Sequence, residues 1–160
     1  MAYLRVGEFL DRVRAIHRAF QRHYRQSAYW QSDDRLRMLL ERMATQEKAL
    51  ASTAEHWGSA ADATVRETWM QYVPLERVAE VLEDTEVDPN EDIERVIAKA
   101  TAFDAAIVEA YRALASSMLP PRVRDVFESL AQMEENKGKQ RSMSAEELYE
   151  PTPGQEDEDG

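Results

Sequence analysis

The stretch HRAFQRHYRQSAYWQSDDRLRMLLERMATQE, residues 17–47, decides the fold because the chain contains a second version of it. Residues 104–134 read DAAIVEAYRALASSMLPPRVRDVFESLAQME, and the two segments align without a gap at an offset of 87 residues. In the 33-residue window that begins at Ala15, ten positions are identical: Ala15/Ala102, Ala19/Ala106, Tyr24/Tyr111, Arg25/Arg112, Ala28/Ala115, Arg35/Arg122, Arg37/Arg124, Glu41/Glu128, Ala44/Ala131 and Glu47/Glu134. Chance similarity between two Ala- and Arg-rich helices explains this many ungapped identities poorly.

Apolar residues between the identities are also matched in class, and they recur at three- and four-residue steps. That spacing places them on one face of a helix. The matched pairs are Ile16/Phe103, Phe20/Ile107, Leu36/Val123, Leu39/Val126, Leu40/Phe127 and Met43/Leu130. Each copy is therefore predicted to be two helices with a short joint, and the chain to be an all-α four-helix bundle made of two repeated hairpins.

The boundaries follow from capping and breaking residues. Hairpin one is predicted over residues 6–57, with Ser32 as the N-cap of its second helix. Asp88, followed by a proline and then an acid at position 91, predicts the start of hairpin two, which covers residues 90–141. The bundle as a whole is expected to span residues 1–143.

Two segments have no counterpart in the repeat. The crossover, residues 58–89, joins the hairpins and is predicted to contain short helices near residues 61–72 and 75–82, separated by Pro74. A connection of that length can run along the whole bundle, as in ferritin-type connectivity. Residues 144–160 are acidic and carry prolines, so we expect a disordered C-terminal tail.

Composition excludes several classes of function. The net charge of −11 argues against general nucleic-acid binding, which needs clustered Lys and Arg. The chain has no cysteine, which removes thiol catalysis, disulfides and Cys-based metal sites. It shows neither a signal peptide nor an apolar run long enough to span a membrane. We therefore expect a cytoplasmic protein that binds neither nucleic acid nor membrane.

Arranged as two repeated helical hairpins, the chain resembles the ferritin-like proteins, and among them the rubrerythrin-like branch. The resemblance covers residues 10–56 and 97–141. In each hairpin the family has a Glu in the first helix with a Tyr seven residues later, and Glu-x-x-His in the second helix. The resemblance implies that these groups would hold two metal ions in the middle of the bundle. Tyr24 and Tyr111 match the tyrosines, and residues 44–48 look like a rubrerythrin segment.

The chain departs from the family pattern at four of six ligand positions. Glu47 and Glu134 keep the motif glutamates. Where the family has the first-helix Glu, this chain has His17 and Asp104, and where it has histidines, this chain has Leu50 and Lys137. The resemblance therefore implies a degenerate di-iron site rather than a complete one.

Our main interpretation is a vestigial site closed by a salt-bridge network, with no metal and no cofactor. Buried carboxylates are costly without a counter-charge. We expect Lys137 to pair with Glu134, Glu47 or Asp104, Leu50 to fill the space of an imidazole, and His17 to hydrogen-bond a carboxylate. His23 and His56 lie off this face and are expected at the surface.

The alternative interpretation keeps a metal. His17, Glu47, Asp104 and Glu134 offer one ligand from each helix, an oxygen-rich set suited to iron or manganese. This would make the protein a divergent mononuclear or dinuclear metal-binding oxidoreductase or an iron-handling protein.

Three functions therefore stay open. The first is a non-enzymatic structural or interaction module that forms a homodimer or another homo-oligomer. The second is the metal-dependent oxidoreductase. The third is an adaptor that binds a small ligand or a helix of a protein partner, with the apolar residues 69–75 or the acidic tail as the contact.

Overall fold

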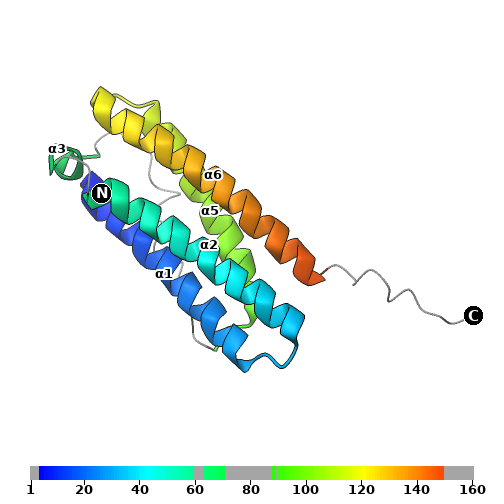
Figure 1. Ribbon diagram of the computed structural model, residues 1–160. Helices are drawn as coiled ribbons and strands as arrows, with labels where there is room; N and C mark the ends of the chain where they lie inside the picture. The colour runs from blue at the N-terminus through cyan, green and yellow to red at the C-terminus, as the bar shows by residue number, and fades with distance from the viewer. Residues whose placement is uncertain (1–3, 60–62, 71–87, 89, 150–160) are drawn as a thin grey trace, which may run out of the picture.

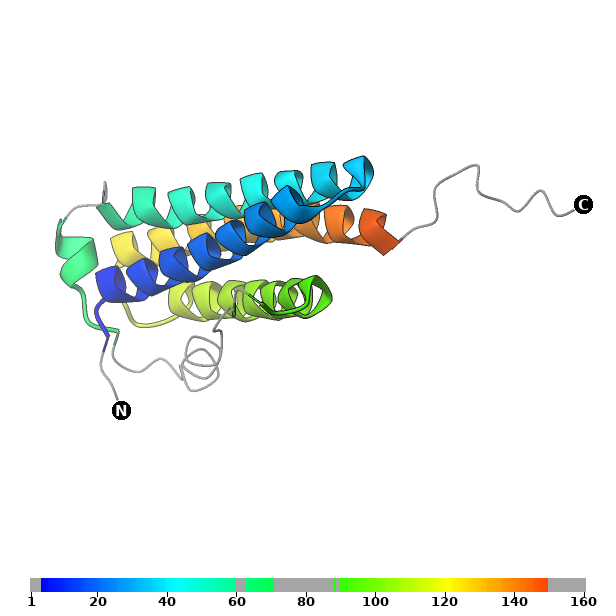
Figure 2. The ribbon, with the colours of Figure 1, turned by 90° about the horizontal axis from the view of Figure 1, so that it is seen from below.

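Four long helices lie side by side in the computed structural model, which describes residues 4–59, 63–70, 88 and 90–149 (Figures 1 and 2). A fifth, short helix lies near the start of the first. The helices are α1 (Val6–Trp30), α2 (Asp34–Ser59), α3 (Ala63–Glu67), α5 (Ile93–Ala115) and α6 (Pro121–Tyr149). The prediction of an all-α chain is confirmed. None of the helices described is long and apolar enough to cross a membrane.

The long helices form two antiparallel hairpins. Short joints connect α1 to α2 and α5 to α6, and the main contact between the hairpins is made by α2 against α6. Figure 1 shows α2 and α5 running in the same direction, so the end of α2 and the start of α5 lie at opposite ends of the bundle. This arrangement places the middle of all four long helices around one common interior.

Two helix starts differ from the sequence prediction by a few residues. The side chain of Asp33, rather than Ser32, caps α2, because its Oδ1 accepts the backbone N–H of Arg35 at 2.9 Å. Asp92, rather than Asp88, caps α5, and its carboxylate accepts the N–H of Glu94. Asp88 instead closes a turn by accepting the N–H of Asn90 at 2.9 Å. In both cases an aspartate further along the chain caps the helix in place of the predicted residue.

The other ends also show differences. Helix α2 continues through Gly58 to Ser59, two residues beyond the predicted end of hairpin one at residue 57. Helix α6 runs to Tyr149, eight residues beyond the predicted end at 141, so its last turns include the start of the segment expected to be disordered. Residues 150–160 lie outside the described residues.

Of the crossover, the structure describes residues 58–59, 63–70 and 88. Helix α3 is shorter than the predicted helix over residues 61–72, and the second predicted helix lies outside the described residues. Arg66 anchors α3 to α1, because its Nη2 lies 2.9 Å from Oδ2 of Asp11 and its guanidinium packs against Gly7. Trp69 is 45% exposed, with the Arg5 guanidinium 4.7 Å from its ring centre.

Aromatic side chains fill the core between the hairpins. The ring of Phe9 meets those of Tyr111 and Phe127 edge-on, at centroid distances of 6.0 and 6.3 Å. Phe20 and Phe103 form a second contact between α1 and α5 at 6.0 Å. These rings have no measurable exposure. Of these rings, Phe103 packs directly against His17, at a centroid distance of 5.2 Å, so the aromatic core helps to keep water away from this buried side chain.

Candidate functional site

Four ionisable side chains, one from each long helix, are buried in the interior of the bundle. His17 comes from α1, Glu47 from α2, Asp104 from α5 and Glu134 from α6. Their exposed fractions run from zero for His17 and Glu47 to 6% for Asp104. Charged side chains this buried are rare unless they are paired. These are the four residues that the sequence analysis proposed as one ligand from each helix.

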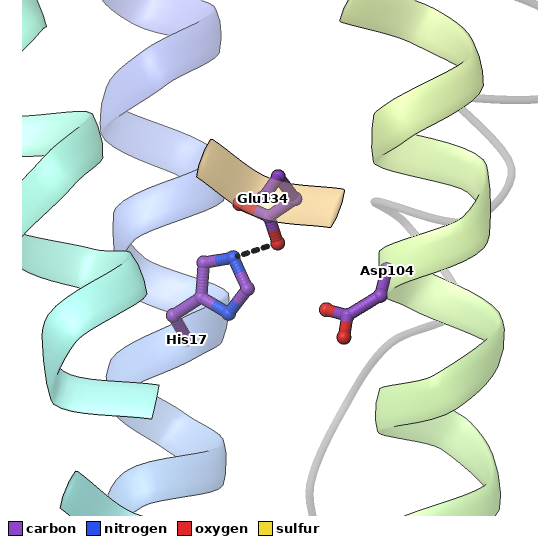
Figure 3. A group of neighbouring side chains, drawn as sticks. All are labelled: His17, Asp104 and Glu134. Carbon is purple, nitrogen blue, oxygen red and sulfur yellow. Dashed lines mark ion pairs between the residues drawn. The ribbon is translucent and has the colours of Figure 1, made fainter. Parts of the chain in front are cut away.

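His17 bridges two of the three carboxylates. Its Nδ1 lies 2.7 Å from Oε2 of Glu47, and its Nε2 lies 3.0 Å from Oε1 of Glu134. Figure 3 shows the His17–Glu134 pair and the side chain of Asp104, which extends toward it from α5. The Nδ1 contact is a hydrogen bond, whereas the Nε2 contact is an ion-pair distance that does not have hydrogen-bond geometry. Two carboxylates this close to the ring favour the imidazolium, which carries hydrogen on both nitrogens. The geometry therefore describes a cation held between two glutamates.

The pKa of His17 agrees with this protonation state. Burial lowers the pKa, but the charges and hydrogen bonds of Glu134 and Glu47 raise it by more, and the result is a pKa of about 9. The imidazolium therefore persists at neutral pH. The edge of the neighbouring ring contributes packing, since the centroid of Phe103 lies 5.2 Å from that of His17.

Asp104 completes the cluster from the other hairpin. One ligand atom from each of His17, Asp104 and Glu134 lies within 4.8 Å of the others. On the opposite side, Oδ2 of Asp104 lies 3.3 Å from the point that a Cβ on Gly138 would occupy. Three carboxylates thus lie around one imidazolium. The backbone of α6 approaches Asp104 closely, because residue 138 is a glycine and has no side chain.

The structure does not show the ion pair that we expected Lys137 to form with a buried carboxylate. Within the part of the chain described, Lys137 forms no ion pair with Glu47, Asp104 or Glu134, and its side chain is only half-buried. The inward face of α6 passes through Glu134 and Gly138, which leaves Lys137 at its flank. The counter-charge that we expected from Lys137 comes from His17. Leu50, by contrast, is 1% exposed and packs in the interior.

His23 differs from the expectation, whereas His56 follows it. His23 is buried, because its Nε2 lies 3.1 Å from the carbonyl oxygen of Glu91 and its Nδ1 lies 3.3 Å from Oγ of Ser27. His56 is exposed. The sequence offered no signal for the burial of His23, because Glu91 lies 68 residues away and belongs to the segment before α5.

Tyr24 and Tyr111, which the 87-residue offset pairs, are both fully buried. Burial, assisted by the charge of Glu134, raises the pKa of Tyr111 well above 10. The Tyr111 hydroxyl has no hydrogen-bond partner among the described residues. A buried hydroxyl in that situation lowers stability.

Removing this hydroxyl should therefore stabilise the protein. We expect Tyr111→Phe to raise the free energy of unfolding by about 1 kcal/mol, because the ring packing stays and an unsatisfied polar group is lost. Urea-induced unfolding followed by circular dichroism measures the change. A loss of stability of similar size would show that the hydroxyl has a favourable interaction, and would contradict this reading.

A groove between α5 and α6 lies beside the cluster. It has a volume of about 540 Å³ and is lined by Thr101, Ala105, Val108, Gly138 and Met143, with Asp104 and Glu134 among its walls. Neither this groove nor the place of Gly138 beside Asp104 was predicted from the sequence. A glycine four residues after Glu134, in the interior of a helix, was the available signal, because such a glycine often marks a close approach.

Comparisons with protein-family models, with curated proteins and with solved structures find no match to this chain.

Proposed function

We propose that the protein is a degenerate ferritin-like bundle that has lost the di-iron centre and acts as a structural or interaction module. One observation carries the proposal: the His17 ring is held by Glu47 on one nitrogen and by Glu134 on the other. An internal cation thus occupies the place between carboxylates where a metal ion would bind. The parallel course of α2 and α5, the 87-residue repeat and the buried Tyr24 and Tyr111 support the ferritin-like assignment.

Exposed apolar side chains support a role in association. Tyr29, Trp30 and Met38 gather near the joint between α1 and α2, with exposed fractions of 78%, 75% and 63%. Large exposed aromatic residues are typical of contact surfaces. A homodimer or another homo-oligomer in the cytoplasm remains the assembly that we propose.

A metal site is the second candidate, and the proximity of His17, Asp104 and Glu134 favours it. The imidazole must lose a proton before it can ligate a metal. With a pKa of about 9, that step reduces metal affinity about 100-fold near pH 7. A metal would also have to break at least one contact of the His17 ring. The donor set thus suits iron or manganese chemically, but the protonated histidine opposes binding.

Metal content separates the two candidates. The protein would be produced without a His tag in medium supplemented with iron and manganese, desalted, and analysed for metals. We expect no stoichiometric metal in the wild type. Stoichiometric metal that disappears in Glu47→Ala/Glu134→Ala would overturn the proposal and favour the oxidoreductase.

A gain-of-function variant sharpens this test. His17→Glu removes the internal cation and adds a fourth carboxylate, so the cluster should then bind Mn²⁺ or Fe²⁺ and gain thermal stability when either is added. The wild type should gain none. Glu41→Gln, at an exposed position on α2, is the control and should behave like the wild type.

A further inference from the structure

Positive charge is concentrated on α1. This helix holds five arginines and two acids, in a chain whose net charge is −11. Four of the arginines follow one another at steps of four, four and three residues, which places them on one face of the helix. These four form the basic stripe: Arg14, Arg18, Arg22 and Arg25. A local cluster of this kind attracts negative charge even on an acidic protein.

The two halves of the basic stripe differ in their partners. Arg14 and Arg18 both lie close to Glu55 of α2, at 3.4 and 3.2 Å, so one carboxylate serves two guanidinium groups. Arg22 and Arg25 are exposed, and neither forms an ion pair with a residue that the structure describes. The half of the stripe nearer the joint between α1 and α2 is therefore a positive surface without a counter-charge among these residues.

A shallow pocket between α1 and α2 adjoins this half of the stripe. It has a volume of about 330 Å³ and is lined by Arg25, Ala28, Tyr29, Glu41 and Thr45. Tyr29 is 78% exposed, so its ring presents an apolar surface beside the guanidinium group. Glu41 is the one acid among these five residues. The pocket can therefore receive a short peptide segment whose acidic side chains contact the arginines.

The residues that follow α6 have the opposite charge. Residues 150–160 contain five acids and no Lys or Arg, and four of the acids are consecutive, at positions 156–159. Carboxylates pair well with guanidinium groups, because their two oxygens can accept two parallel N–H hydrogen bonds. Charge complementarity therefore matches this acidic segment to the basic stripe.

The acidic segment begins within reach of the stripe. Helix α6 packs against α2 and ends near the joint between α1 and α2 in both views (Figures 1 and 2). From the level of the His17–Glu134 contact, α6 continues for 15 residues, whereas Arg25 lies eight residues along α1. The end of α6 is thus about 10 Å further along the bundle, at 1.5 Å per residue. Two interaxial distances add at most about 20 Å sideways. Ten extended residues span about 33 Å, so residue 159 can reach Arg25.

We propose that residues 156–159 bind to Arg22 and Arg25 of the same chain, with the backbone lying over the pocket beside Tyr29. Single exposed ion pairs contribute little. A tethered segment, however, is held at a high effective concentration, so several weak contacts act together. The segment then covers Tyr29, which belongs to the exposed aromatic surface near the joint, and a partner that uses this surface must displace it. That competition rests on the proposed contact role, whereas the docking itself does not.

Other basic side chains near this end of the bundle are partly neutralised. Arg37 pairs with Asp34 at 2.6 Å, and Lys139 lies 3.5 Å from a carboxylate oxygen of Glu135. Each of these cations has its acid on its own helix, three or four residues away. Arg22 and Arg25 have no such partner among the described residues, which favours them as the contact for the acidic segment.

Paramagnetic relaxation in NMR spectra tests the contact in the full chain. The protein has no cysteine, so Gln155→Cys gives a single site for a nitroxide label. The reference is the same labelled protein with its four acids at 156–159 changed to Gln or Asn. We expect the amide signals of residues 22–29 to broaden about threefold more than in the reference, because the charged segment stays at this face. The excess should vanish in 1 M NaCl, where the Debye length is about 3 Å.

Two double variants locate the contact. Arg22→Gln/Arg25→Gln removes the proposed partners and should abolish the excess broadening. Arg12→Gln/Lys139→Gln removes the same charge at exposed positions, one on another face of α1 and one on α6, and should keep the excess. The amide spectrum establishes that each variant is folded. The reference changes no residue that the structure describes, so the comparison stands even if an arginine variant is unstable.

Three results would overturn the proposal. The first is equal broadening with and without the charges at 156–159. The second is a loss of the excess in the control variant as large as in Arg22→Gln/Arg25→Gln. The third is undiminished broadening in a mixture of ¹⁵N-labelled protein without nitroxide and nitroxide-labelled protein without ¹⁵N, which would mean that the segment binds another chain. EDTA is present throughout, so failure here leaves the metal analysis of the proposed function unaffected.

Discussion

Replacing His17 by leucine should reduce the free energy of unfolding by about 3–5 kcal/mol at neutral pH, the range found when one partner of a buried ion pair is removed. The loss follows because Glu47 and Glu134 stay buried while the imidazolium that contacts both of them is gone. A domain of this size is stable by only about 5–15 kcal/mol. Urea-induced unfolding should therefore show a large shift of the midpoint.

His23 provides a matched control on the same helix. It is also buried, but its contacts are the carbonyl oxygen of Glu91 and the hydroxyl of Ser27, neither of which is charged. His23→Leu should cost only about 1–2 kcal/mol, because no buried charge is left behind. Equal losses for the two histidines would show that His17 acts as an ordinary core histidine.

A triple variant tests the cause of the loss. Adding Glu47→Gln and Glu134→Gln to His17→Leu removes the buried charges together with their partner. Stability should then recover by several kcal/mol relative to His17→Leu, because buried ion pairs are often replaceable by neutral groups when all members are changed. Further destabilisation would mean that lost packing, rather than an unpaired charge, explains the effect of His17→Leu.

The helices and the central residues could be predicted from the sequence, for physical reasons. Apolar spacing of three and four residues reports the buried face of a helix directly. The 87-residue offset places His17 opposite Asp104 and Glu47 opposite Glu134 in the repeat, so residues from four helices could be assigned to one cluster. The structure brings these four residues together in the interior.

The partners of these residues could not be predicted in the same way. A three-residue step from Glu134 allowed Lys137 to face the cluster, yet the same helix face also passes through Gly138. Which of the two points inward depends on the rotation of α6 against α5, and no local pattern sets that rotation. The same limit applies to His23, whose partner Glu91 is remote in sequence. Capping was ambiguous where two candidate residues lay close together, as at Ser32 and Asp33.

The charge on His17 should make the stability of the protein fall as the pH rises from 6.5 through about 9. The pKa of this group is raised from 6.5 to about 9 in the folded protein, so the folded state binds the proton more tightly than the unfolded chain does. The resulting stabilisation is fully present below pH 6.5 and is lost as the pH rises through about 9. Its size corresponds to about 3 kcal/mol.

Unfolding free energies measured across this interval, together with the NMR titration of the His17 ring, test this expectation. The ring should titrate with a midpoint near 9, and His17→Gln, which cannot ionise, should show a nearly flat profile over the same interval. Tyr111 does not interfere, because burial raises its pKa well above 10.

A His17 midpoint below 7 would mean that the ring is neutral in the native protein. A neutral ring would carry no counter-charge for Glu47 and Glu134, and the barrier to metal binding would disappear. The titration of this one ring therefore decides between a charge-paired centre and a site open to metal.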